Sequence, residues 1–174
     1  MIACPYCGSE VIPGSDVCDN CGHSLTDIGL LEPASEVERG LLSDVIGSLK
    51  PRKALTLGPS ASIREALSAM VDGKIGCVMI IDNQGGLLGI FTERDALKKV
   101  NADFAKLGDK PLHTVMTPKP DALALDDKIA FALHKMNLGG YRHVPILEDG
   151  RLAGVISIRD ILSYLTSRTA APQG

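Results

Sequence analysis

The sequence has very few aromatic residues. Its 174 residues include no Trp, three Tyr and three Phe, so aromatic residues make up 3% of the chain, while hydrophobic residues make up 45%. A core built from this composition must be aliphatic, as in α/β modules rich in Val, Ile, Leu and Ala. Length and composition together predict one ordinary domain with a small appendage.

Long apolar runs are also missing. No stretch approaches the roughly 20 apolar residues that a membrane-spanning helix needs, and the first residues lack the pattern of a secretory signal. The formal net charge is −3, and the five cysteines suit a reducing compartment. We therefore expect a cytoplasmic protein without membrane attachment.

The common catalytic signatures do not occur. The chain contains no GxSxG, no HExxH and no phosphate-binding glycine loop followed by lysine. His113 and His134 have no evident catalytic partner in the sequence. An enzyme needs an activated nucleophile, a carboxylate pair or an open metal position, so the sequence predicts a binding protein that is not an enzyme.

One seven-residue pattern occurs twice. Gly-Ile-Phe-Thr-Glu-Arg-Asp at 89–95 returns 65 residues later as Gly-Val-Ile-Ser-Ile-Arg-Asp at 154–160. In each copy a β-branched strand leads to an apolar helix, and a Thr or Ser precedes an Asp by three residues. Thr92 and Ser157 are predicted N-caps, with Asp95 and Asp160 at the third helical position of a capping box. Anions and sugar hydroxyls are favoured at such a helix start.

The repeat extends upstream of this pattern. Each copy predicts a brief strand, an amphipathic helix and a buried strand with a turn. Ser62 is the expected N-cap of the first helix, whereas Lys128 stands at that place in the second, so Asp126 or Asp127 should cap it. The segment between the copies, 101–120, is expected to be a surface loop. The fold class is therefore α/β (α+β), with two β-α-β-β-α units; the expected strands before and after the two helices are 54–57, 77–81, 122–125 and 144–147.

These elements resemble a known family. Met116-Thr117-Pro118, the run His143-Val144-Pro145-Ile146, the Asp-Gly turn and the doubled seven-residue pattern are similar to a tandem pair of CBS domains, the Bateman module. The resemblance covers about Leu49 to Ser167 and implies two repeats in a pseudo-two-fold arrangement. It implies repeats at 51–109 and 110–168. The rest of the sequence predicts a metal-binding segment at 1–26, a linker with an amphipathic helix at 27–50 and a flexible tail at 169–174.

The same resemblance implies a regulatory ligand. In the family an aspartate binds the ribose of an adenosine ligand, which assigns this role to Asp95 and Asp160, with Thr92 and Ser157 beside them. Arg142 and His143 are then phosphate-side candidates for the Asp95 pocket; the corresponding Gly76 and Cys77 leave the Asp160 pocket without a comparable cation. The ligand would be AMP, ADP, ATP or another adenosyl metabolite. The alternative is that both aspartates only cap helices in a ligand-free scaffold.

Four cysteines form two knuckles near the N-terminus. Ten residues separate the pair Cys4 and Cys7 from the pair Cys18 and Cys21, and a glycine follows each pair. Four thiolates in this spacing predict a structural Zn²⁺ site. Disulfides or a redox pair are the alternatives, and neither a signal peptide nor a βαβ pattern supports them. The segment resembles a zinc ribbon. His23 is expected at the surface, and Cys77 is expected to be a small buried hydrophobe.

The remaining expectations concern partners. Residues 1–26 contain no Lys or Arg, so binding to nucleic acid is disfavoured and docking to an unknown protein partner is favoured for the ribbon. Ser35 should start a connector helix that continues to Leu49; this helix packs on the CBS pair or, alternatively, serves a dimer or orients the ribbon. By resemblance, we expect a homodimer formed through the CBS helices.

Overall fold

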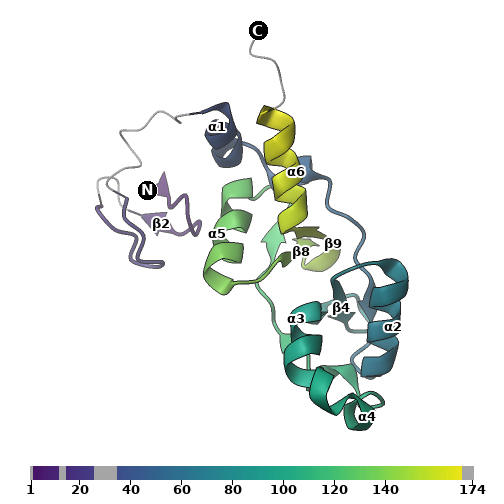
Figure 1. Cartoon of the computed structure of the whole chain (residues 1–174). Helices are drawn as coiled ribbons and strands as arrows, with labels where there is room; N and C mark the ends of the chain where they lie inside the picture. Colours follow the sequence, from purple (N-terminus) through teal and green to yellow (C-terminus); the bar gives the residue numbers. More distant parts are fainter. Residues whose placement is uncertain (1, 12–14, 26–34, 170–174) are drawn as a thin grey trace. The chain divides into compact units, whose positions relative to one another are not determined.

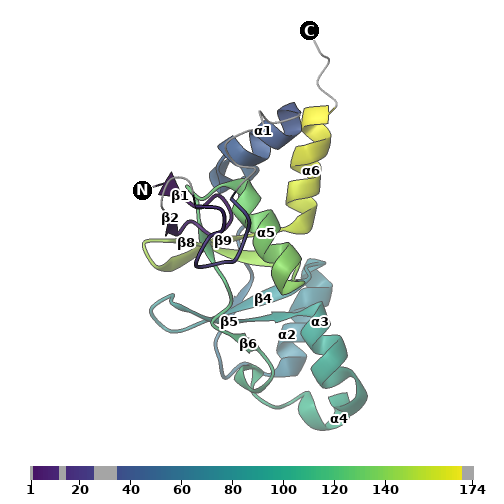
Figure 2. The same cartoon turned by 90° about the vertical axis from the view of Figure 1, so that its left-hand side faces the viewer.

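The computed structural model describes residues 2–11, 15–25 and 35–169. Its contacts divide the chain into two compact units (Figures 1 and 2). The first unit comprises Met1–Lys50, Leu125–Arg142 and Ser157–Gly174, and the second comprises Pro51–Ala124 and His143–Ile156. Residues 170–174 of the predicted tail and residues 27–34 of the predicted linker lie outside the described residues.

The second unit contains a four-stranded sheet built mainly from the first repeat. Its strands lie in the order β3-β4-β5-β6, with β3 parallel to β4 and the other pairs antiparallel (Figure 2). Helix α2 (Ile63–Gly73) starts where predicted, since the Ser62 hydroxyl accepts a hydrogen bond from the Glu65 N–H at 3.1 Å. Buried Ile63, Val78 and Phe91 belong to one aliphatic-rich core. The strands are β3 (Thr56–Leu57), β4 (Cys77–Ile81), β5 (Leu87–Thr92) and β6 (Thr117–Pro118).

A second sheet in the same unit comes from the second repeat. Strand β7 (Leu123–Ala124) pairs in parallel with β8 (His143–Glu148), and β8 neighbours β9 (Arg151–Ser157). Asp149 and Gly150 join β8 to β9 with φ angles of 48° and 75°. Two successive positive φ angles match the twist of a tight hairpin, which is why Asp-Gly suits this turn. The mixed α/β architecture with two sheets agrees with the fold class expected from the sequence.

The two repeats are interleaved at their leading segments. Strand β6 precedes the second repeat's helix, yet it pairs with β5 of the first repeat, Thr117 opposite Ile90. Reciprocally, Arg52, which precedes the first repeat's helix, pairs with Val155 of the second. A Cβ at Gly89 would lie 2.9 Å from the Thr117 carbonyl, and one at Gly154 would lie 2.9 Å from the Arg52 carbonyl. The glycine that begins each repeated pattern therefore leaves room for the backbone of the other repeat to approach closely.

The segment at 101–120 is not the surface loop that we expected. After α3 (Glu93–Asp95) the chain forms a π-helical turn η2 (Ala96–Val100), a 3₁₀ turn η3 (Asn101–Asp103), helix α4 (Phe104–Leu107) and a 3₁₀ turn η4 (Leu112–Thr114). Leu112 is fully buried, and its N–H donates to the Ala61 carbonyl at 2.7 Å. The loop prediction failed because the apolar side chains at 104–115 complete the core around α2.

The first unit combines the cysteine segment with three helices. Strands β1 (Ile2–Ala3) and β2 (Glu10–Val11) pair antiparallel. Helices α1 (Glu36–Ser43), α5 (Ile129–Gly139) and α6 (Ile158–Thr169) pack side by side (Figures 1 and 2). Among the described residues, no helix combines the length and the apolar character that crossing a bilayer would require.

The connector helix is shorter than predicted. Ser35 caps it, accepting from the Glu38 N–H at 3.1 Å, but α1 ends at Ser43 and a separate 3₁₀ turn, η1 (Ile46–Leu49), follows. Asp44 is extended, and its carbonyl accepts from the N–H of Ile129 at 3.1 Å. A continuous helix would use that carbonyl internally, so the break provides the backbone acceptor that starts α5.

The predicted cap of α5 was wrong. Neither Asp126 nor Asp127 is its N-cap; Lys128 is, and Lys128 forms no side-chain cap hydrogen bond. The Lys128 ammonium instead donates to the Ser43 carbonyl at 2.7 Å. Backbone groups after α1 thus satisfy the helix start in place of an aspartate side chain.

Candidate metal and ligand sites

The four N-terminal cysteines converge on one point. Their sulfur atoms all lie within 4.8 Å of one another, with Cys4 and Cys21 at 3.8 Å and Cys7 and Cys18 at 3.6 Å. Sulfurs bound tetrahedrally to Zn²⁺ at 2.3 Å are about 3.8 Å apart, whereas a disulfide is about 2.05 Å long. The set therefore fits one four-coordinate metal ion and contains no disulfide.

Both knuckles fold in the same way. The Gly8 N–H donates to the Cys4 carbonyl and the Gly22 N–H to the Cys18 carbonyl, each at 2.8 Å. Gly8 and Gly22 have φ angles of 74° and 70°, a region that L-residues with a Cβ avoid. The two glycines that follow the cysteine pairs in the sequence thus close the two turns that carry the sulfurs.

Hydrogen bonds lower the pKa of the Cys7 thiol. Burial raises the pKa of Cys7, but the Ser9 hydroxyl and backbone and the Asn20 amide more than offset this, so the pKa falls to about 6. The Ser9 hydroxyl lies 2.9 Å from the Cys7 sulfur. A thiolate is the form that binds a metal ion.

His23 and His134 have partners that the sequence did not reveal. His23 stacks on Tyr6 with ring centroids 4.3 Å apart, and His134 of α5 meets the edge of His23 at 4.5 Å. These ring contacts had not been predicted from the sequence, which had indicated a surface position for His23 and no catalytic partner for His134. Burial, followed by the positive charges of His23 and Lys135, lowers the pKa of His134. The three aromatic rings thus pack together between the ribbon and α5.

The first repeated pattern forms the predicted capping box. The Thr92 hydroxyl accepts from the Asp95 N–H at 3.3 Å, and Asp95 Oδ2 accepts from the Thr92 N–H at 3.0 Å. The Thr92 hydroxyl also lies 2.7 Å from the same carboxylate oxygen. These bonds hold the Asp95 carboxylate in one orientation at the end of β5.

Two further groups approach the other oxygen of Asp95. The Lys99 ammonium lies 2.7 Å from Oδ1, and the Thr117 hydroxyl donates to Oδ1 at 3.2 Å. Burial raises the pKa of Asp95, but the hydrogen bonds from Lys99 and Thr92 and the Lys99 charge outweigh it and leave the pKa below its usual value. Asp95 is therefore an ionised carboxylate at neutral pH. The sequence analysis had identified neither Lys99 nor Thr117 as part of this site.

His143 reaches the first repeat's signature. A Cβ at Gly76 would lie 2.9 Å from His143 Cε1 and 3.2 Å from Glu93 Oε2. The Gly76 carbonyl accepts from the Glu93 N–H at 3.1 Å, which ties this glycine to the residue after Thr92. His143 of the second repeat thus lies beside the start of α3 in the first.

The second pattern repeats part of this geometry in the first unit. Asp160 Oδ2 accepts from the Ser157 N–H at 2.6 Å and from the Ser157 hydroxyl at 2.7 Å. The Arg142 carbonyl accepts from the Ile158 N–H at 2.9 Å, the counterpart of the Gly76–Glu93 bond. A cavity of about 350 Å³ opens here, lined by Arg142, Tyr141, Asn137, Ile158 and three neighbours on or after α5, Leu133, Met136 and Gly140.

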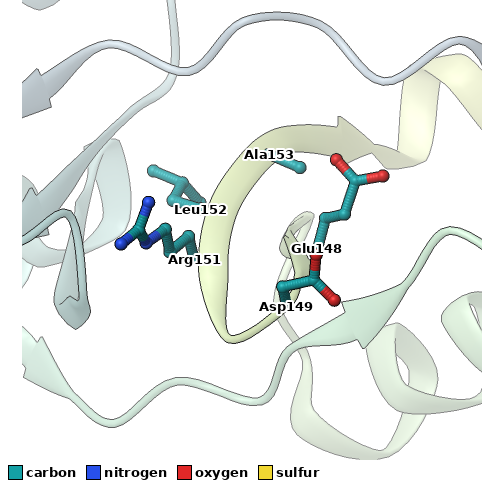
Figure 3. A pocket seen from close by; sticks show the side chains of 5 residues that line it. All are labelled: Glu148, Asp149, Arg151, Leu152 and Ala153. Atoms are coloured by element: carbon teal, nitrogen blue, oxygen red, sulfur yellow. The ribbon is translucent and has the colours of Figure 1, made fainter.

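A second cavity lies at the turn between β8 and β9. It has a volume of about 390 Å³ and is lined by Glu148, Asp149, Arg151, Leu152 and Ala153 (Figure 3). Arg151 points away from the two carboxylates in this view. None of the residues predicted to bind metal or nucleotide lies in this cavity.

Cys77 behaves as a buried hydrophobe, as expected. It is 6% exposed in β4, and burial raises the pKa of its thiol to about 12. The Arg52 charge opposes this shift and the Glu93 charge adds to it.

The structure brings together part of the predicted nucleotide site. Thr92, Asp95 and His143 occur in the second unit, whereas Ser157, Asp160 and Arg142 belong to the first. Assignment of these six residues to an adenosyl ligand stays a prediction. Lys99 could have been found from the sequence by its four-residue spacing from Asp95, but Thr117 reaches the site only through the pairing of β5 with β6.

Comparisons with known proteins agree with this architecture. The CBS domain model matches residues 44–102 and 112–167. An uncharacterised 17.7 kDa protein of Acidianus ambivalens is 33% identical over 122 residues, which cover 69% of this chain and 72% of that protein. A CBS domain-containing protein of Arabidopsis thaliana is 32% identical over 157 residues, 87% of this chain but 28% of its own length. The chain thus spans less than a third of this plant relative.

Solved structures show the same fold. A CBS-domain protein from Agrobacterium tumefaciens is 36% identical, with a TM-score of 0.65 over 70% of this chain and 98% of that one. A CBS domain protein from Pyrobaculum aerophilum, solved in complex with AMP, is 28% identical, with a TM-score of 0.63 over 71% of this chain and 99% of that one. With two family matches in order and the interleaved sheets described above, the chain belongs to the CBS domain family and carries its domains as a tandem pair.

Proposed function

We propose that this protein is a regulatory sensor in which the CBS pair binds an adenine nucleotide or another adenosyl metabolite. The observation that carries the proposal is the Asp95 carboxylate, ionised and oriented by Thr92. A carboxylate held in this way can accept both hydroxyls of a ribose in charge-assisted hydrogen bonds. Ser157 and Asp160 repeat the arrangement in the second copy.

The phosphate side of the proposed Asp95 pocket would use His143, which belongs to the same unit as Asp95. His143 supports this role because it approaches Gly76 and Glu93 at the start of the first repeat's signature. The likeness to the Pyrobaculum aerophilum protein, which was solved with AMP, supports an adenosine ligand. Ligand binding by a CBS pair in this way would give the protein a regulatory role without catalysis.

A ligand-free scaffold is the second candidate. It is favoured by one observation, the set of protein donors that already surrounds Asp95: Thr92, Thr117 and Lys99. In this case the repeated aspartates would stabilise the fold and bind nothing. A nucleic-acid-associated role for the ribbon is less favoured, because residues 1–26 contain no Lys or Arg.

The ribbon would hold one structural Zn²⁺ through Cys4, Cys7, Cys18 and Cys21. Such a site is coordinatively closed, so the ion stabilises the ribbon and leaves no position for a substrate. We assign the ribbon to docking of a protein partner, whose identity the chain does not specify.

We further propose a homodimer formed through the helices of the CBS pair. Large aliphatic side chains are exposed on these helices in both units, with Leu97 70% and Leu162 53% exposed. Burial of such side chains against a second copy would remove apolar surface from water. The expected contact is isologous, the same surface on both chains.

A thermal-shift series separates a sensor from a scaffold. AMP, ADP, ATP, NAD and S-adenosylmethionine are added to the zinc-loaded full chain, with inorganic phosphate and uridine monophosphate as controls. A ligand that binds only the native state raises the melting temperature, and the stabilisation grows with the logarithm of the ligand concentration once that concentration exceeds Kd. A shift with adenosyl compounds alone supports the sensor; the absence of any shift at millimolar concentrations supports the scaffold.

A further inference from the structure

The carboxylate of Asp95 has no vacant acceptor position. Oδ2 accepts from the Thr92 N–H and hydroxyl, at 3.0 and 2.7 Å, while Oδ1 accepts from the Thr117 hydroxyl at 3.2 Å and faces the Lys99 ammonium at 2.7 Å. An ionised carboxylate offers about four acceptor positions. A ribose diol can therefore bind Asp95 only if one of these donors leaves.

Lys99 is the donor best able to leave. Thr92 belongs to the capping box and Thr117 to strand β6, so both are fixed by the backbone. The Lys99 side chain is 41% exposed and ends a flexible four-carbon stem. An ion pair with one partner this exposed is also weak, because solvent competes for the ammonium.

The backbone around Lys99 is unusual. Lys99 lies in η2, a π-helical turn, and its ammonium also donates to the Val115 carbonyl at 2.8 Å. Isolated π turns occur frequently at functional sites. In the second repeat, α6 runs as an α-helix from Ile158, and the position of Lys99 is taken by Tyr164, whose hydroxyl donates to Asp44 at 2.7 Å. The lysine contact is thus a feature of the first repeat.

The free-energy cost of removing the Lys99 ammonium from Asp95 depends on the ligand. The Asp95 side chain is 12% exposed, so the loss of its cation is costly unless the incoming hydroxyls replace it. The displaced ammonium gains a new partner only if the ligand carries an anion. A phosphorylated ligand supplies both groups, whereas a neutral nucleoside supplies the hydroxyls alone.

We propose that Lys99 makes the Asp95 site selective for phosphorylated over neutral adenosyl ligands. When the ribose hydroxyls bind the Asp95 carboxylate, the Lys99 ammonium leaves the carboxylate and binds the phosphate of the ligand instead. This inference rests on the proposed function, since it assumes that Asp95 binds a ribose. Lys99 acts as a specificity-determining residue, and the second repeat, with Tyr164 at the same position, lacks this selection.

The test compares AMP with adenosine by isothermal titration calorimetry. The full zinc-loaded chain carries Asp160→Ala, so that only the Asp95 site is measured, and Lys99→Met is added to this parent. Lys98→Met is the matched control, because Lys98 is the adjacent exposed lysine of the same π turn. Lys99→Gln is a second variant that keeps a donor for the Val115 carbonyl, should Lys99→Met disturb the fold.

The parent should bind AMP at least about tenfold more tightly than adenosine. Lys99→Met and Lys99→Gln should reduce this ratio to about threefold or less, with weaker AMP and tighter adenosine binding, while Lys98→Met leaves it unchanged. An unchanged ratio in the Lys99 variants, or an equal change with Lys98→Met, overturns the exchange but leaves the sensor proposal standing. If neither compound binds the parent or the Lys99 variants, the ligand role of Asp95 is wrong and the exchange is wrong with it.

Discussion

The imidazole of His143 lies against Gly76, at a distance that leaves no room for a side chain at position 76. A Cβ there would be 2.9 Å from His143 Cε1 and 3.1 Å from Nε2. Gly76 occupies the place in the first repeat that Arg142 occupies in the second. The missing side chain in one copy therefore accommodates a side chain from the other, and the difference between the copies has a structural cause.

This contact predicts the effect of Gly76→Ala. The methyl group must displace His143 or Glu93, so we expect a loss of about 1–3 kcal/mol in the free energy of unfolding, as for other overpacked sites. Gly73→Ala is the control, because its new Cβ would be 3.4 Å from Ile75 Cγ1, an ordinary contact. Urea denaturation of both variants measures the difference; equal stability of the two would contradict the close approach.

The role of Asp95 in binding is tested by Asp95→Ala. Loss of the ribose acceptor should weaken adenosyl binding at this site by roughly 1.5–3 kcal/mol, the magnitude of a charge-assisted hydrogen bond. His143→Ala should weaken ATP and ADP more than adenosine, while Asp160→Ala should leave the Asp95 site intact. Calorimetric titration checks all three variants.

A carboxylate elsewhere provides the control for this experiment. Asp82 also accepts backbone N–H bonds, from Gln84 and Gly86 at 2.8 Å, but in a turn outside both repeated patterns. Asp82→Ala should lower stability without any change in nucleotide affinity. Undiminished affinity in Asp95→Ala and Asp160→Ala would mean that both aspartates serve as caps alone.

The lowered pKa of Asp95 predicts a pH-dependent contribution to stability. Because the folded-state pKa lies below the unfolded value of about 3.9, the contribution is present above that pH and is lost as the pH falls through the folded-state pKa. The stability difference between the wild type and Asp95→Asn, about 1–2 kcal/mol at pH 7, should shrink on acidification. Denaturation curves at pH 7 and at successive values below pH 4 measure it; a constant difference would count against the assignment.

The cysteine cluster predicts about one zinc per chain and no iron. Chelation should unfold the ribbon while the CBS pair stays folded, because the metal site supplies much of the ribbon's stability. The rings of Tyr6 and His23 should then leave His134, which NMR of the His134 imidazole can follow. Cys77→Ala, a change to the fifth cysteine, should leave the zinc content unaltered, whereas Cys4→Ser should reduce it. Disulfides in freshly reduced, zinc-supplied protein would refute the metal site.

Dimer formation is tested by charged substitutions on the exposed helices. Leu97→Glu and Leu162→Glu should convert the dimer to a monomer, because a buried carboxylate without a partner is unfavourable in an interface. Leu42→Glu, at an exposed position of α1, is the control and should leave the mass unchanged. Light scattering over a wide concentration range gives the result, and a monomeric wild type would reject the proposal.

Local sequence patterns were sufficient for several elements. Thr92 and Ser62 cap helices as predicted because capping depends on a side chain and a backbone N–H three residues apart. Strand β4 has the expected bounds because a run of buried β-branched and apolar residues is itself the signal. The cysteine spacing was likewise enough to predict four sulfurs at one point.

Contacts between distant segments were decided only by the tertiary structure. The end of α1 at Ser43 and the cap of α5 both depend on the Asp44 carbonyl, which is 85 residues away from Ile129 along the chain and meets it only after folding. The same holds for Thr117, which reaches Asp95 through the pairing of β6 with the other repeat's sheet. The sequence by itself determined the two repeats, the caps at Ser62 and Thr92 and the two cysteine knuckles, because these depend on neighbours within a few residues. Among the donors around the Asp95 carboxylate, Thr92 follows from the local capping pattern, whereas Thr117 arrives only through the pairing of β6 with β5, which no local pattern encodes.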